Sequence, residues 1–483
     1  MTSEVIVLAN EGKPVIDKKS LKQLFFNSTD FVIIDVDWPT GKGILCYYSS
    51  LVDTAEVNKQ ITIIQQYAAE KMSNWGKTAV SEVKPYSEAE LITAVCSGLT
   101  VVIFQDSQVM LTISAQSSFS RSPNEPEAEQ VVRGPHDGFI ESTQQNLTLI
   151  RRKLERSDLV VKSFEVGKEP KKKITYLFIS TIADKNVVEL LESRLRDIQD
   201  EEILNTGELE DFLEDSVFSP FPQFLNTERP DRVVMNLMEG RIAIFTNNSP
   251  TALIAPISFF SFYQSPDDFN GRVIVGSFFR LLRIMSLVMA IYLPAFYIAV
   301  VGFHSEILPI EISKKVKLAI NEIPYRPIFE AIILEVFIEL IREASIRLPK
   351  PIGQTIGVVG GLIIGDAIVN AGLVSNLMVI VVALTAISSF VIPTLEMNMS
   401  IRIIRFPFML ASALFGFFGM AIGTLLLVIH LLSLSSLKQP YFSPFIPLDT
   451  TRFMNVLFRM PYSKFNKQQQ TFTFINKKKG RKS

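Results

Sequence analysis

The stretch that decides the fold class of this chain runs from Pro407 to Ser436, PFMLASALFGFFGMAIGTLLLVIHLLSLSS, and contains no Asp, Glu, Lys or Arg. About 20 apolar residues at 1.5 Å each cover the roughly 30 Å of a bilayer core. Ile284–Phe303 is also uncharged, and the region from Ile352 to Pro393 carries Asp366 as its single charge. The sequence therefore predicts four membrane-spanning helices, at about residues 284–303, 352–371, 375–393 and 407–434.

The residues before the first apolar run mix charged and apolar side chains as a soluble protein does, and alternating apolar strands and helical patterns predict an α+β fold there. Residues 116–130 are rich in Ser, Pro and Glu, which is typical of a linker. We find no internal repeat. The predicted organisation is two α/β subdomains at 1–115 and 131–270 joined by this linker, a helical membrane domain at 271–445, and a basic, partly disordered tail at 446–483.

Composition and motifs exclude several classes of function. The net charge is −1, so nothing indicates a nucleic-acid partner. The two cysteines, Cys46 and Cys96, lie outside any CxxC spacing, and the three histidines lie in different regions. HExxH, GxSxG, GxxxxGK[ST] and GxGxxG are all absent. The sequence predicts no enzyme, and no catalytic, cofactor-binding or metal-binding residue.

Residues 328–347, IFEAIILEVFIELIREASIR, form an amphipathic acidic helix. At 100° per residue Glu335, Glu339 and Glu343 share one stripe. A lipid-exposed carboxylate at the bilayer centre would cost about 2.5–3.5 kcal/mol. The stripe must face water, a pore vestibule or an oppositely charged partner. The alternative is an interfacial helix whose acidic face is solvated and paired internally.

Four glycines recur every four residues in GQTIGVVGGLIIG, which leaves a groove along one helix face; they are Gly353, Gly357, Gly361 and Gly365. Such a groove lets another helix backbone approach closely. It predicts either packing within one subunit or an interface between subunits. Asp366 follows the last glycine, and an intramembrane acid is a functional candidate. Because Asp366 lies near a helix end, it could equally reach the headgroups.

The segment SPFPQFLNTERPDR, residues 219–232, contains three prolines that hold it rigid without regular hydrogen bonding. Glu228, Arg229, Asp231 and Arg232 alternate in sign. We expect them to form a salt-bridged junction between the soluble and membrane halves, or else an ordinary loop anchor. In LPKPIGQ, residues 348–354, two prolines are expected to end the acidic helix before the glycine-rich span.

Several long strings resemble the A-subunit family of bacterial spore germinant receptors, the GerA family. They are VVRGPHDGFIES at 131–142, NLTLIRRKL directly after, SPFPQFLNTERPDRV at 219–233, QSPDDF at 264–269, and FEAIILEVFIELIREASIRLPKPIGQTIGVVGGLIIGDA at 329–367. The resemblance covers about residues 130–445. The first 120 residues and the tail do not contribute to it.

The resemblance implies a multi-pass protein of the inner spore membrane that assembles with a permease-like B subunit and a lipoprotein C subunit. It implies sensing of nutrients such as amino acids or sugars, and oligomerisation into a nutrient-gated ion channel that starts germination. On that hypothesis Glu335, Glu339, Glu343 and Asp366 are candidates for the pore or its vestibule. The alternative is a non-conducting scaffold that couples the nutrient-binding subunit to a separate channel. A transporter ranks below both, because we see no inverted repeat.

Overall fold

The computed structural model describes residues 17–38, 41–68, 80–104, 109–116, 125–126, 129–131, 133–168, 171–311, 313–314, 316 and 323–459. The described residues fall into two compact units. The α/β unit lies within Met1–Glu214 and Phe224–Ile257, and the helical unit comprises Asp215–Gln223 and Ser258–Pro461. Most of the expected linker at 116–130 and the basic end of the tail lie outside the described residues.

The first half of the α/β unit is a five-stranded antiparallel sheet of order β1-β2-β4-β5-β3. Its strands are β1 (Phe31–Trp38), β2 (Gly41–Tyr48), β3 (Val80–Pro85), β4 (Leu99–Phe104) and β5 (Val109–Ser114). Its helices are α1 (Lys18–Leu24), α2 (Thr54–Ala68) and α3 (Glu88–Cys96). The apolar patterns predict a strand at 31–38 and a hairpin of strands at 100–104 and 109–113, and β1 and the β4–β5 pair confirm both.

The second half repeats this topology with the order β6-β7-β9-β10-β8, again antiparallel throughout. Its strands are β6 (Leu159–Val166), β7 (Lys172–Ile179), β8 (Leu225–Thr227), β9 (Ile242–Thr246) and β10 (Ala252–Ala255). Its helices are α4 (Thr143–Lys153), α5 (Lys185–Asp197), α6 (Thr206–Leu213) and α7 (Pro230–Met238). The two halves therefore form a structural repeat, although no repeat is visible in the sequence. Strand pairing follows the apolar pattern of each strand, and different sequences can share such a pattern.

Helix α7 was not expected, because the prolines of 219–233 indicated a rigid loop. Pro230 occupies the first turn of α7, where a proline needs no amide hydrogen and its fixed φ suits a helix. The proline that suggested an irregular loop is therefore the first residue of helix α7.

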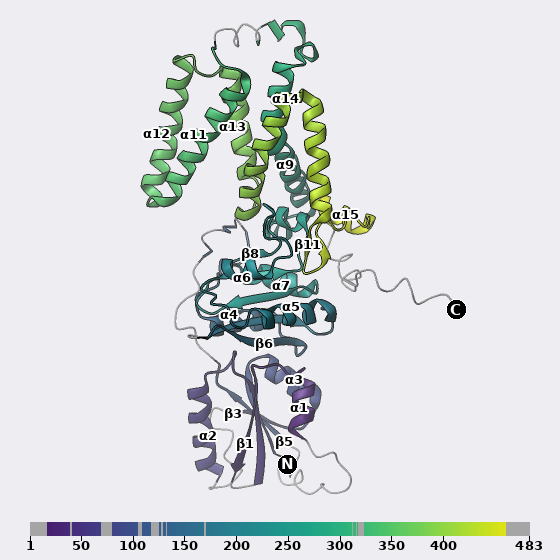
Figure 1. The fold of residues 1–483 in the computed structure, drawn as a ribbon. Helices are drawn as coiled ribbons and strands as arrows, with labels where there is room; N and C mark the ends of the chain where they lie inside the picture. The colour runs from purple at the N-terminus through teal and green to yellow at the C-terminus, as the bar shows by residue number, and fades with distance from the viewer. Residues whose placement is uncertain are drawn as a thin grey trace, which may run out of the picture. The chain divides into compact units, whose positions relative to one another are not determined.

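The helical unit consists mainly of α9 (Val273–Gly302), α11 (Pro327–Arg347), α12 (Lys350–Asn370), α13 (Asn376–Phe390) and α14 (Leu395–Ser433), with shorter helices around them (Figure 1). Among the described residues, two helices are long and apolar enough to cross a membrane, namely α9 and, when its 39 residues are taken as one helix, α14. Four spans were expected. Of the remaining two, α12 matches the span at 352–371 in position, and α13 has 15 residues, about 22 Å at 1.5 Å each, which is short of a bilayer core.

The expected single span at 407–434 is wrong, because Gly416 interrupts α14 with φ 58° and ψ −137°. This left-handed conformation suits only glycine. The chain folds back there: the ring of Phe408 lies 5.0 Å from that of Tyr292, whose hydroxyl lies 3.0 Å from Thr424 Oγ1. Residues 395–415 and 417–433 are therefore two arms of a hairpin, each about 25–32 Å long.

A buried ion pair joins the two halves of the α/β unit. Arg151 of α4 donates from Nε and Nη2 to the carboxylate of Asp30 at 2.6 and 2.7 Å, and its guanidinium lies 3.6 Å from the ring centre of Tyr48. Burial alone would raise the pKa of Asp30. The charge and hydrogen bonds of Arg151, with hydrogen bonds from Ser28 and Ser50, outweigh burial and hold that pKa below its usual range.

We predict that Asp30→Asn destabilises the α/β unit by roughly 3–5 kcal/mol at pH 7, because it leaves the buried Arg151 without its counter-charge. The lowered pKa of Asp30 means that the contribution is fully present above the unfolded value, about 3.9, and is lost as the pH falls through the folded value. Denaturant unfolding followed by tryptophan fluorescence measures both effects.

Asp35→Asn is the matched control, because Asp35 pairs with Lys18 on the surface, where a pair contributes about 1 kcal/mol or less. Equal losses from the two substitutions would contradict the structural role of the Asp30–Arg151 pair. A difference between wild type and Asp30→Asn that stays constant below pH 5 would contradict the pKa argument.

Candidate functional site

Helix α11 is bounded by prolines at both ends. Pro327 stands at its first position, and Leu348 and Pro349 follow its last residue, Arg347. The expected break before the glycine-rich helix is confirmed, since Pro349 is the N-cap of α12. Helix α11 packs mainly against α12 and α13 and also contacts α9 and α14. It thus places its acidic stripe inside the helical unit.

Two of the three carboxylates of the stripe meet arginines of the first arm of α14. Arg405 pairs with Glu335, both side chains being at most 2% exposed, and its Nε donates to the carbonyl of Ala290 on α9 at 2.9 Å. One turn further along, Arg402 Nε donates to Glu339 Oε1 at 2.7 Å. The charged residues of α11 and α14 thus neutralise each other inside one chain.

The third carboxylate, Glu343, lies apart from these pairs. It binds Arg347 of the same helix at 2.6 Å, and its side chain is 61% exposed. The expected pairing four residues along the helix is therefore present. Arg342 turns toward α13, where its guanidinium lies 4.4 Å from the ring centre of Phe390 and 3.4 Å from Ser389 Oγ. The stripe is thus split between a buried part and an exposed part.

The buried pairs are not fully satisfied within the described residues, where Glu335 Oε1 and Arg405 Nη2 have no hydrogen-bond partner. Nearer the start of α11, Glu330 is fully buried, and its Oε2 accepts a 2.9 Å hydrogen bond from the amide of Ser375, the N-cap of α13. A buried charge network with few spare bonds is sensitive to the loss of any member.

The four glycines of α12 divide into two pairs. A side chain at Gly353 would meet the backbone oxygen of Ser345 on α11 at 2.6 Å, and one at Gly357 would lie 3.7 Å from Ser345 Oγ. A side chain at Gly361 or Gly365 would meet nothing within 4 Å. Packing within the chain thus explains the first pair and leaves the second pair on an open face. Asp366, next to this face, is exposed.

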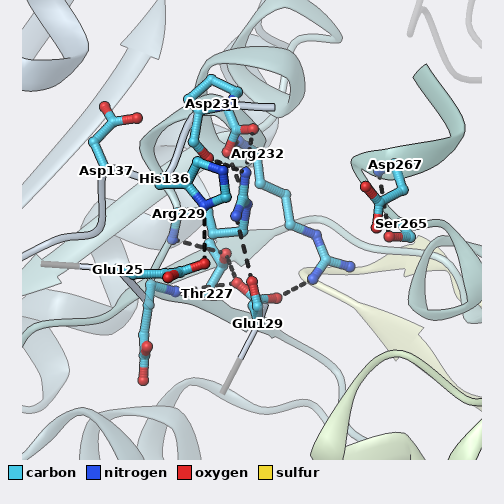
Figure 2. Close-up of polar contacts among 12 residues, drawn as sticks. Glu125, Glu129, His136, Asp137, Thr227, Arg229, Asp231, Arg232, Ser265 and Asp267 are labelled. Atoms are coloured by element: carbon cyan, nitrogen blue, oxygen red, sulfur yellow. Dashed lines mark hydrogen bonds and ion pairs between the residues drawn. The ribbon is translucent and has the colours of Figure 1, made fainter. Parts of the chain in front are cut away.

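The charged cluster at 228–232 belongs to the α/β unit, and Figure 2 shows Arg232 of this cluster reaching Glu129. Arg229 is fully buried, grips Asp231 at 3.0 and 2.7 Å, and donates to the carbonyls of Glu129 and Pro135. Arg232 pairs with the side chain of Glu129. The backbone carbonyl of Glu228 accepts from the amide of Phe139 at 2.8 Å. The cluster fastens residues 129–139 onto α7, and its role as a junction between the halves remains a prediction.

The residues that sequence reasoning missed lie just before this cluster, at 215–223, which belong to the helical unit although their flanks belong to the α/β unit. Gln223 is fully buried and closes this loop by accepting from the amides of Asp215 and Ser216 at 2.9 and 3.0 Å. The carbonyls of Pro222 and Gln223 accept from Tyr441 Oη at 2.8 Å and Ser436 Oγ at 2.6 Å. The only sequence signal was the density of prolines.

His430, near the end of α14, contacts the same loop. Its Nε2 lies 3.0 Å from Ser219 Oγ, and its ring lies 6.0 Å from the ring of Phe221. Because His430 lies in an apolar run, the sequence favours a hydrogen-bonded packing role over metal ligation, and this geometry agrees with that role. The loop is therefore held at both arms of α14, since Ser400 of the first arm donates to the carbonyl of Pro220.

We predict that Arg405→Gln lowers the apparent melting temperature of the detergent-solubilised chain by roughly 10 °C, because an unpaired buried Glu335 costs about 3–5 kcal/mol. Glu335→Gln should cost a similar amount, and the double variant should recover much of the loss. Circular dichroism at the helical band measures this. Arg347→Gln, which breaks the exposed pair with Glu343, is the control and should change little; additive effects of the two buried substitutions would contradict the coupling.

Similarity to known proteins extends over nearly the whole chain. The family model described as Bacillus/Clostridium GerA spore germination protein matches residues 19–471. An uncharacterized membrane protein of Bacillus subtilis (strain 168), YfkQ, is 38% identical over 98% of this chain and 95% of that protein. Spore germination protein A1 of the same organism is 38% identical over 82% of this chain and 83% of that protein.

Among solved structures, the N-terminal domain of the A subunit of the Bacillus megaterium spore germinant receptor GerK3 aligns with 50% of this chain and 93% of that chain, at 27% identity and a TM-score of 0.38. The family match extends over both the α/β unit and the helical unit, including all the candidate residues described above. The chain therefore belongs to the GerA family of spore germination proteins.

Proposed function

We propose that this chain is the membrane subunit of a nutrient-sensing germination receptor and that it oligomerises into a nutrient-gated ion channel in the inner membrane of the spore. The observation that carries the proposal is the open glycine face of α12. Among the described residues no helix fills the groove at Gly361 and Gly365, and in a membrane protein such a groove is suited to a helix of a neighbouring subunit. Gly353 packs against α11 of the same chain, whereas Gly361 is open. In this proposal the first part of the groove serves packing within the subunit, and the second part serves packing between subunits.

The charges of α11 can be divided in the same way. Glu335 and Glu339 are bound by arginines of their own chain, so in this proposal they hold α11 against α14. Glu343, which pairs with Arg347 on the same helix face, and Asp366 are exposed, and in this proposal these two carboxylates attract cations near a pore mouth. Glu343 lies on α11 and Asp366 on α12, the helix that carries the open face. This supports a conducting path beside α12.

The partners in the proposal are a permease-like B subunit and a lipoprotein C subunit, with nutrients such as amino acids or sugars read by the complex. The proposed membrane arrangement is multi-pass, with α12 and α13 accompanying α9 and the α14 hairpin. The loop at 215–223 is the proposed coupling element, since its ends continue into the α/β unit and its hydrogen bonds lie in the helical unit.

A second candidate is a non-conducting scaffold that couples the nutrient-binding subunit to a separate channel. The observation in its favour is the internal neutralisation of the charges on α11. A subunit that pairs Glu335 and Glu339 with its own arginines has fewer groups available to line a hydrated path. The two candidates differ in whether nutrients evoke ion flux through an assembly of this chain and its two partners.

We predict that proteoliposomes containing the three subunits release monovalent cations when amino acids or sugars are added. Gly361→Leu should abolish the release, because its side chain fills the open groove, whereas Gly302→Leu should not, because Gly302 on α9 is equally open and lies outside the groove. Glu343→Gln and Asp366→Asn should each reduce the preference for cations over anions. Ion-selective electrodes measure flux, and reversal potentials measure preference.

Absence of nutrient-evoked release from a correctly assembled wild-type complex would reject the channel and leave the scaffold. Loss of release in both leucine variants would show that the open glycine face has no special part. Unchanged ion preference in Glu343→Gln and Asp366→Asn, with release intact, would remove these two carboxylates from the conducting path.

A further inference from the structure

The segment that follows α14 returns to the start of α9 and is fastened there. It contains α15 (Thr450–Leu457), which packs on α9 (Figure 1). Arg280 Nη1 of α9 donates to the carbonyl of Asn455 at 2.7 Å, and the amide of Arg459 donates to Ser277 Oγ at 3.1 Å. The buried guanidinium of Arg459 also donates to the carbonyl of Gly271. These bonds fix the backbone of the segment against the first turns of α9.

This fixed segment exposes large apolar side chains. Those more than 40% exposed between residues 445 and 458 are Phe445, Ile446, Leu448, Met454 and Phe458. The first turns of α9, to which the segment is bound, expose Ile274, Val275, Phe278 and Phe279 to a similar or greater degree. Exposed apolar surface of this density on adjoining elements indicates a surface that is covered in the working protein.

The position of the segment along α9 indicates that membrane lipid covers this surface. Helix α9 has 30 residues, about 45 Å at 1.5 Å each, whereas a bilayer core is about 30 Å thick. The apolar run without charge begins after Arg283, so the turns before it project to the level of the lipid headgroups. Arg280 and Arg283 both bind Asp268 there, as charged residues at the edge of a span do.

Aromatic rings gather at the same level. The ring of Phe442 lies 5.3 Å from that of Phe260, 5.8 Å from that of Phe259 and 5.4 Å from that of Phe445. The ring of Phe445 in turn lies 5.5 Å from that of Phe453 on α15. Phenylalanine is typical of the apolar face of an element that lies in the membrane interface.

We propose that residues 445–458, together with the first turns of α9, form an anchor that lies in the boundary between headgroups and acyl chains of the membrane that α9 crosses. A short amphipathic helix held flat at this depth buries its apolar face in lipid and leaves its polar face in water. The residues that follow, 462–483, contain seven basic and no acidic side chains. Their charge complements the anionic lipids of such a surface.

The experiment places a nitroxide on the full chain in liposomes of phosphatidylcholine and phosphatidylglycerol. Leu448, Met454 and Phe458 are replaced one at a time by cysteine and labelled. The native thiols of Cys46 and Cys96 are buried, and burial raises their pKa to about 12 and about 11, so they stay protonated and react slowly. The unsubstituted chain measures any remaining background label.

Power-saturation electron paramagnetic resonance then compares collisions with oxygen, which concentrates in lipid, and with a water-soluble nickel chelate. We expect oxygen collisions to exceed nickel collisions at all three positions. Leu204→Cys is the matched control, since Leu204 is an apolar side chain 70% exposed on the α/β unit, and its label should show the reverse order.

Nickel collisions as frequent at 448, 454 and 458 as at 204 would overturn the proposal, because the face would then lie in water. Low collisions with both reagents would also overturn it, because protein would then cover the face. In that case, dipolar broadening that disappears on dilution with unlabelled chain would identify a second copy as the cover, and its absence would identify another part of the same chain or complex.

Discussion

The helical unit depends on the neutralisation of buried charge. Helix α11 carries carboxylates on a face that packs inside the unit, and a charged carboxylate is costly to bury without a counter-charge. Arg405 removes that cost for Glu335 and at the same time binds the backbone of α9 through Ala290. One pair therefore fixes the relation among α9, α11 and the first arm of α14. Arg402 and Glu339 repeat the bond one turn along, which sets the rotation of the two helices about their axes.

The other constraints on the helical unit are steric, and glycines satisfy them. Gly416 takes a conformation that a side chain would strain, and this lets α14 fold back as a hairpin instead of continuing as one long helix. Gly353 admits the backbone of α11 at a distance that no side chain would permit. Charge pairing thus determines which helices meet, and glycine determines how closely they meet. Within the part of the chain that the structure describes, the positions of Gly361 and Gly365 stay open.

The α/β unit uses buried ion pairs for a related purpose, to join segments that are distant in sequence. Arg151 binds Asp30 between its two halves, and Arg229 with Arg232 binds residues around Glu129 to α7. In each case the guanidinium has several partners at once, which a flexible point charge could not match. The two halves share their strand order, and specific ion pairs join the segments that are distant in sequence.

The sequence by itself determined the local elements and the class of the protein. Apolar alternation was enough to predict β1, β4, β5 and β6 close to their observed bounds, and the break at Pro349 followed from the chemistry of proline. The quoted strings were enough to indicate the GerA family. The acidic stripe of α11 and the glycine period of α12 were also visible, because helical periodicity is a local property.

Only the tertiary structure decided which partners these residues take. Nothing near Glu335 in the sequence indicates Arg405, and nothing marks Glu129 as the partner of Arg232. Length and hydropathy predicted one span at 407–434, but the chain reverses at Gly416, where an added side chain would meet Phe303 and His304. By sequence alone Pro230 is compatible with a loop or with the first turn of a helix, and in the folded chain it starts α7. The physical reason is the same throughout: propensity and periodicity act between neighbours along the chain, whereas charge pairing and close packing act between neighbours in space.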